Sequence, residues 1–154
     1  MAKDIFIVAL IILIIGIIYQ IFFNNPPLSK VSVKIKDIDF SLEVAKTIPQ
    51  KSKGLMNRNT LAANSGMVFV SEFEMPQIFW MKNTLIPLDM IFVDKNGQVI
   101  NILTATPEPN STPDTQLTLY KSASPAKYVI ELNAGASQKL NLVSGDKINL
   151  SNVK

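Results

Sequence analysis

The chain has 154 residues and a net charge of +3, and it contains neither cysteine nor histidine. These absences exclude disulfides, cysteine nucleophiles, Ser-His-Asp triads and zinc sites built from Cys and His. The positive charge is weak and no basic cluster is interleaved with aromatic residues, so nucleic-acid binding has little support.

The N-terminal residues 5–23 form an uncharged, apolar run. A helix of this length would span roughly 30 Å, which is the thickness of a hydrocarbon core. A cleaved signal peptide would have a shorter apolar region and a small-residue cleavage site, and a buried soluble helix would have a polar face. We therefore expect residues 1–25 to be an uncleaved signal anchor and residues 26–30 to be a linker.

The orientation of this anchor depends on the flanking lysines. Lys3 and the amino terminus favour a cytoplasmic N-terminus, whereas Lys30, Lys34 and Lys36 oppose it. Long domains are translocated largely regardless of their charge. We expect a single-pass protein of a prokaryotic cell membrane, with residues 30–154 outside the cytoplasm.

Residues 31–154 are predicted to form a single β-rich domain. Alternating apolar residues predict two strands over 31–35 and 38–44, joined by a tight turn. Thr47, with Pro49 and Gln50 close behind it, predicts the start of a short helix that continues through residues 50–58.

The rest of the domain alternates short apolar segments with turns. Strands are predicted over residues 66–70, 78–83, 88–94, 98–106, 127–132 and 147–150, and a Pro/Ser/Thr-rich loop over 107–118. This pattern predicts a mainly β fold, a compact barrel or sandwich of short, mostly antiparallel strands with one or two short helices. A doubly wound α/β fold is disfavoured because long helices between the strands are missing.

Several motifs in this domain occur in an order that is typical of one family. They are Gly54-Leu-Met-x-Arg58, Gly66-Met-x-Phe69, Phe79-Trp-Met-Lys-Asn-Thr84, Ile86-Pro-Leu-Asp89, Tyr128-Val-x-Glu-Leu132, Ala134-Gly135 and Gly145-Asp146. Over about residues 40–150 the chain resembles the prokaryotic domain-of-unknown-function family numbered one hundred and ninety-two. The resemblance implies a compact, mainly β domain, often behind a signal sequence or membrane anchor, and no established activity. The hallmark residues that it marks here are Arg58, Trp80, Lys82, Asn83, Asp89 and Glu131.

Two interpretations of these hallmark residues remain open. In the first, the charges satisfy one another, through a Lys82–Asp89 or an Arg58–Asp89 ion pair. In the second, they bind a small anionic or sugar-like ligand: Arg58 and Lys82 hold an anion, Trp80 stacks on the ligand, and Asn83 donates a hydrogen bond. The second interpretation describes a binding or accessory module, with an envelope protein as an alternative partner.

An enzyme acting on cell-envelope glycans is the alternative function, with Asp89 and Glu131 as the acid and the base. This hypothesis requires both carboxyl groups to open on one cleft. A purely structural envelope protein is a further alternative. No cofactor or metal is predicted: the methionines are spread over many elements, and a hairpin turn explains Asp94-Lys-Asn-Gly97.

Overall fold

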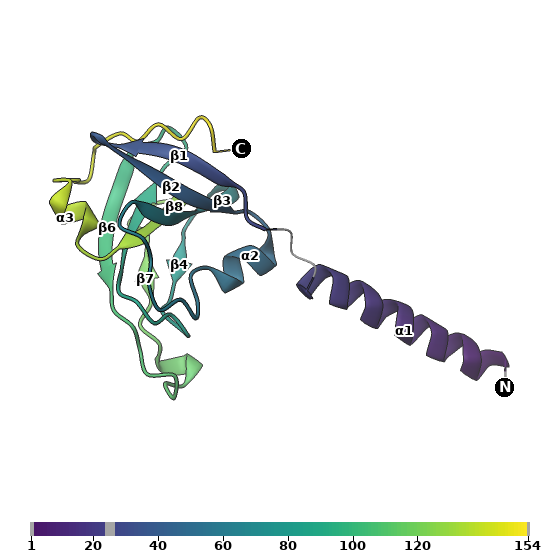
Figure 1. Ribbon diagram of the computed structural model, residues 1–154. Helices are drawn as coiled ribbons and strands as arrows, with labels where there is room; N and C mark the ends of the chain where they lie inside the picture. The colour runs from purple at the N-terminus through teal and green to yellow at the C-terminus, as the bar shows by residue number, and fades with distance from the viewer. Residues whose placement is uncertain (1, 24–26, 154) are drawn as a thin grey trace.

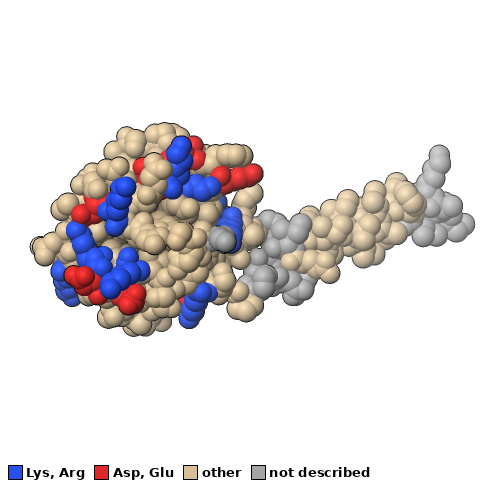
Figure 2. Space-filling model, turned by 90° about the horizontal axis from the view of Figure 1, so that it is seen from above, with Lys and Arg blue, Asp and Glu red and all other residues tan. Residues whose placement is uncertain are grey.

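The computed structural model describes the backbone of residues 2–23 and 27–153, and the side chains of residues 6–18, 20 and 27–153. The first element, helix α1 (Ala2–Phe23), extends away from the β domain (Figure 1). Its described side chains include no charged residue, as Figure 2 shows. Among the described residues, no helix is both long and apolar enough for a membrane crossing. Most of the predicted junction between anchor and linker, at residues 24–26, lies outside the described residues.

The domain is built on one mixed sheet of six strands. In spatial order these are β1 (Lys30–Ile35), β2 (Ile38–Ala45), β3 (Ser65–Met75), β8 (Ala126–Asn133), β5 (Leu88–Val93) and β6 (Val99–Ala105). β2 and β3 are parallel, and the other neighbours are antiparallel. A second sheet pairs β4 (Ile78–Phe79) with β7 (Tyr120–Lys121).

The mainly β prediction is confirmed, and of the two predicted forms, barrel or sandwich, no closed barrel is found among the described strands. The described strands form an open sheet with β1 and β6 at its edges. The parallel β2–β3 pair requires a crossover connection, which contains α2 (Ile48–Lys53). Period-two patterns indicate where strands occur but carry no information on which strands pair, so this topology was not visible in the sequence.

Three short helical elements accompany the sheets. The predicted capping box of α2 is confirmed: Thr47 Oγ1 accepts a hydrogen bond from Gln50 N at 3.3 Å, and Gln50 Oε1 accepts one from Thr47 N at 3.1 Å. The helix ends before the predicted residue 58, because Gly54 adopts a positive φ of 46°. The others are a 3₁₀ turn η1 (Asp114–Gln116), within the predicted loop, and α3 (Ala136–Lys139).

The central strands are buried on both faces of the sheet. Val68, Ile91 and Ile130 belong to one apolar cluster, which also contains residues of β1, β2 and the C-terminal segment. Met67 and Met90 belong to a second cluster on the opposite face, with residues from the α2 and β4 regions. This second face is where a cavity opens.

Gly66 allows close packing in the centre of the sheet. A β-carbon at this position would collide with the backbone oxygen of Glu131 and lie 2.9 Å from Leu42 Cδ2. We expect Gly66→Ala to lower the free energy of unfolding by about 2–3 kcal/mol, measured by urea denaturation, since neighbouring strands must move apart. Ser65→Ala, in the same strand, is the control, and equal midpoints for the two variants would contradict the prediction.

Candidate functional site

An open cavity of about 250 Å³ lies between α2 and β4, on the second face of the sheet. Its lining combines apolar side chains with a few polar groups, which is the usual composition of a ligand site. The lining residues are Lys51, Ser52, Lys53, Gly54, Leu55, Met56, Phe69, Gln77, Ile78, Phe79, Trp80, Thr84 and Glu131.

Glu131 is the acidic residue of this cavity. It lies in β8 directly opposite Met67 of β3 and Met90 of β5, and its side chain is therefore on the same face as theirs. Only 5% of Glu131 is exposed. Within the described residues, its carboxyl group makes no hydrogen bond or ion pair, and burial raises its pKa to about 8. At neutral pH this carboxyl is therefore mostly protonated.

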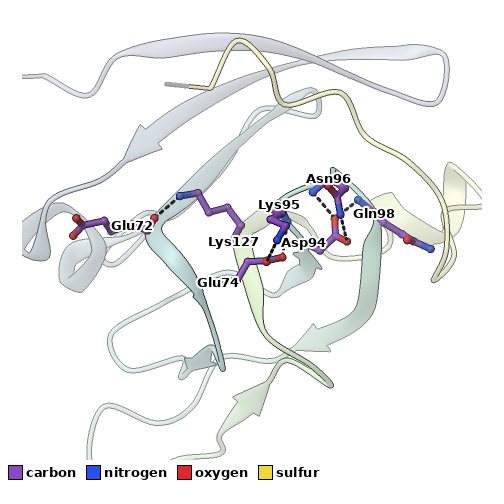
Figure 3. Close-up of polar contacts among 7 residues, drawn as sticks. All are labelled: Glu72, Glu74, Asp94, Lys95, Asn96, Gln98 and Lys127. Carbon is purple, nitrogen blue, oxygen red and sulfur yellow. Dashed lines mark hydrogen bonds and ion pairs between the residues drawn. The ribbon is translucent and has the colours of Figure 1, made fainter.

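Another wall of the Glu131 cavity is formed by the segment that leads from the end of β3 into β4. The end of β3 runs beyond its partner β2 and is held by two polar contacts (Figure 3). The carboxylate of Glu74 accepts a hydrogen bond from Lys95 N at 2.9 Å, and Lys127 Nζ donates one to the backbone oxygen of Glu72 at 2.6 Å. These contacts fix the position from which the chain enters β4.

Gln77, the residue before β4, links this strand to the main sheet through hydrogen bonds. Its side-chain amide donates to Ser71 Oγ at 2.9 Å and to the backbone oxygen of Ala126 at 3.3 Å. Beyond it, the ring of Phe79 packs edge-to-face on Phe69, with 4.9 Å between ring centroids. Trp80, the only tryptophan of the chain, is 51% exposed and lines the cavity.

The mouth of the cavity carries positive charge. Lys51 and Lys53 of α2 are lining residues, the first half-buried and the second exposed, and the only carboxyl among the lining residues is that of the buried Glu131. The pKa of Lys51 is lowered, mainly by burial and also by the neighbouring charge of Lys127. The cavity therefore offers cations at its mouth and a neutral carboxyl group inside.

The predicted Lys82–Asp89 ion pair is wrong. Lys82 Nζ instead lies 2.5 Å and 2.7 Å from the two carboxylate oxygens of Asp114. The reason is local: the predicted strand over 78–83 stops at Phe79, and a turn follows in which Thr84 N donates to the backbone oxygen of Met81 at 3.0 Å. Lys82 therefore reaches the 107–118 loop and not β5.

The alternative Arg58–Asp89 pair is also wrong. Arg58 binds both carboxylate oxygens of Glu43 at 3.0 Å and 2.6 Å. The hydrogen bond from Arg58 is the main cause that lowers the pKa of the Glu43 carboxyl. Arg58 and Lys82 thus have carboxylate partners of their own, and neither lines the Glu131 cavity.

Asp89 is a buried structural anchor. It is 1% exposed, and its two carboxylate oxygens accept hydrogen bonds from Thr104 Oγ1 and from Ser137 N, each at 2.8 Å. Met90, the next residue in β5, is the one that lies opposite Glu131. Since successive side chains of a strand alternate, Asp89 and Glu131 point to opposite faces of the sheet. The predicted acid/base pair for glycan hydrolysis is therefore wrong.

Asn83 joins two of the family motifs through its backbone. It adopts a left-handed φ of 55°, and its carbonyl oxygen accepts a hydrogen bond from Asn57 N at 2.8 Å. Asn57 is also left-handed, with a φ of 61°. Asparagine tolerates this conformation better than most residues, which gives both positions a conformational role.

Of the six predicted site residues, the cavity brings together Trp80 and Glu131. The prediction missed Lys51, Lys53 and Gln77. For Glu131 the sequence carries a direct signal, because this charged residue interrupts a strand that is apolar on both sides of it. No group of three or more acidic side chains that could hold a metal ion occurs in the part of the chain that the structure describes.

Comparisons with other proteins assign the chain to a family. The model of the DUF192 family, described as an uncharacterized ACR, matches residues 31–150. Comparison with curated proteins gives no match. A similar crystal structure, of a suspected transcription regulator from Sinorhizobium meliloti 1021, has 31% identity and a TM-score of 0.70, over 81% of this chain and 96% of that one. Another, of a protein of unknown function from Novosphingobium aromaticivorans DSM 12444, has 34% identity and a TM-score of 0.66, over 79% of this chain and 84% of that one. The chain therefore belongs to the DUF192 family.

Proposed function

We propose that this domain is a binding module that takes up a small anionic or sugar-like ligand in the Glu131 cavity. The observation that carries the proposal is a buried carboxyl group that faces this cavity without a partner among the described residues. A buried polar group without a hydrogen bond destabilises a fold, so its presence needs a compensating role. Binding a ligand is such a role.

The surroundings of Glu131 support this ligand class. Lys51 and Lys53 attract negative charge at the mouth, and Trp80 offers an exposed ring on which a sugar or another flat group stacks. A protonated carboxyl can donate one hydrogen bond and accept others, which suits hydroxyl groups.

The single tryptophan allows a direct test. We expect titration of the full-length chain with a set of monosaccharides, sugar acids and small carboxylates to change the fluorescence of Trp80 for at least one member. Glu131→Leu should weaken that binding at least tenfold, because leucine can neither donate nor accept a hydrogen bond.

Phe73→Ala is a control substitution outside the cavity, since Phe73 is 71% exposed and does not line it. It should bind like the wild type. If no member of the set alters the fluorescence, or if Glu131→Leu binds equally well, the cavity is not a binding site for this class.

We further propose that residues 5–23 anchor the domain to the cell membrane, with the domain outside the cytoplasm. In support, the apolar side chains of α1 are exposed, among them Phe6 at 71% and Ile12 at 64%. Large exposed apolar surfaces mark interaction sites. Fractionation of cells that express the full-length chain should recover it with the membranes, and protease added to intact spheroplasts should degrade the domain. A soluble or protease-protected domain would contradict the proposal.

A further inference from the structure

We propose that the ligand of the Glu131 cavity is a small zwitterion: its ammonium group pairs with Glu131, and its acidic group lies beside Lys51 and Lys53. This inference rests on the proposed function and names the ligand more closely. It follows from the presence of two lysines, a buried carboxyl group without a partner among the described residues, and aromatic side chains in the lining of one cavity.

The floor of the cavity suits a cation. Glu131 has no basic partner among the described residues, so a ligand that brings a positive charge would complete a buried ion pair. Three aromatic side chains, Phe69, Phe79 and Trp80, line the same cavity. Aromatic rings stabilise ammonium groups through their electron-rich faces, and sites for organic cations commonly combine such rings with a carboxylate.

The mouth of the cavity disfavours a simple amine. The charges of Lys51 and Lys53 would repel a ligand that carries only positive charge. A ligand that carries only negative charge would leave Glu131 without an ionic partner. A molecule with an ammonium group at one end and an acidic group at the other satisfies both ends of the cavity.

The size of the cavity limits the ligand. Its volume of about 250 Å³ lies just below the roughly 300–1,000 Å³ of sites for drug-sized molecules. A single amino acid or ω-amino acid is therefore a suitable class, whereas a long peptide or an oligosaccharide could place only one unit inside.

Binding of such a ligand has a proton balance that sugars and simple carboxylates lack. The free Glu131 carboxyl is protonated at pH 7, because burial raises its pKa to about 8. The ligand ammonium keeps its proton, so formation of the ion pair requires Glu131 to lose its own proton to the solvent. Each binding event at pH 7 should therefore release about one proton.

Calorimetric titration tests this directly. The full-length chain in non-ionic detergent is titrated at pH 7 with glycine, β-alanine, 4-aminobutyrate and 6-aminohexanoate, in phosphate and in Tris buffer. The two buffers differ in ionisation enthalpy, and the difference in observed heat gives the number of protons released. We expect one of the four to bind with release of about one proton. The simple carboxylic acid and the simple amine of the same chain length should bind at least tenfold more weakly than that compound.

Variants separate the two ends of the site. Glu131→Gln should abolish the proton release and weaken binding at least tenfold, and Lys51→Gln should weaken binding several-fold while the proton release persists. Lys139→Gln, on α3 away from the cavity, is the control and should change neither quantity.

The outcomes distinguish this inference from the proposed function. If sugars or simple carboxylates bind in a Glu131-dependent manner while the four amino acids do not, the proposed function stands and the zwitterion is wrong. Amino acid binding without proton release also overturns the zwitterion. If no compound of either set binds, both are wrong.

Discussion

Replacing Asp89 with alanine is expected to lower the free energy of unfolding by about 4 kcal/mol. Asp89 is fully buried and accepts hydrogen bonds from Thr104 Oγ1 and Ser137 N, so it joins β5 to β6 and to the start of α3. Alanine would leave both donors without an acceptor and would leave a space in the core. Each buried donor that loses its partner costs about 1–3 kcal/mol.

A comparison of Asp89→Ala with a milder substitution and with a surface control tests whether the lost hydrogen bonds cause the destabilisation. Asp89→Asn should cost only about 1–2 kcal/mol, because its amide oxygen can accept from Ser137 N while the hydroxyl of Thr104 turns to accept from the amide nitrogen. Asp39→Ala, at an exposed position in β2, is the control and should stay within about 0.5 kcal/mol of the wild type. Urea denaturation measures all three. Similar stabilities for Asp89→Ala and Asp39→Ala would show that the network contributes little.

The stability of the domain is expected to fall as the pH rises from 5 to 9, and Glu131→Gln is expected to remove most of this fall. The folded protein keeps the Glu131 proton up to a pH of about 8, whereas an unperturbed glutamic acid loses it near 4.5. Between these values the folded state binds more protons than the unfolded state, so a rising pH favours unfolding. An interval of about 3.5 pH units, at about 1.4 kcal/mol for each, corresponds to on the order of 5 kcal/mol.

Comparison of two pH profiles isolates this contribution. Wild type and Glu131→Gln are unfolded in urea at pH 5, 7 and 9, and the difference between their free energies of unfolding is taken at each pH. The contributions of all other titrating groups cancel in this difference. As the pH rises above 5, the free energy of unfolding of the wild type should fall relative to that of Glu131→Gln. Parallel pH profiles for the two proteins would show that Glu131 is not desolvated in the folded state.

Local features of the fold were predictable because their causes lie close together in the sequence. The alternation over residues 31–44 identified β1 and β2, and the Thr47–Gln50 capping box identified the start of α2. The pairing of β8 with both β3 and β5 was not predictable, since it joins residues more than thirty positions apart and leaves no periodic signal.

The site was predictable only in part, because the partners of its charged side chains lie far away in the sequence. The sequence places Lys82 seven residues before Asp89, and a continuous strand would have brought the two charges near each other. The turn after Phe79 redirects Lys82 to Asp114, thirty-two residues away along the chain. Glu131 was identifiable as a charge in an apolar strand, but its lack of a partner depends on packing between distant elements.

The central position of β8 has a consequence for biogenesis. β8 is the last of the described strands along the chain, yet it lies between β3 and β5 and connects the two halves of the main sheet. A nascent chain that ends before residue 126 can form only two separate strand groups, each with an exposed edge on which other chains can pair. Folding of the whole sheet must therefore wait until β8 has been synthesised, and any chaperone that acts before that point would meet the sheet as two unjoined parts.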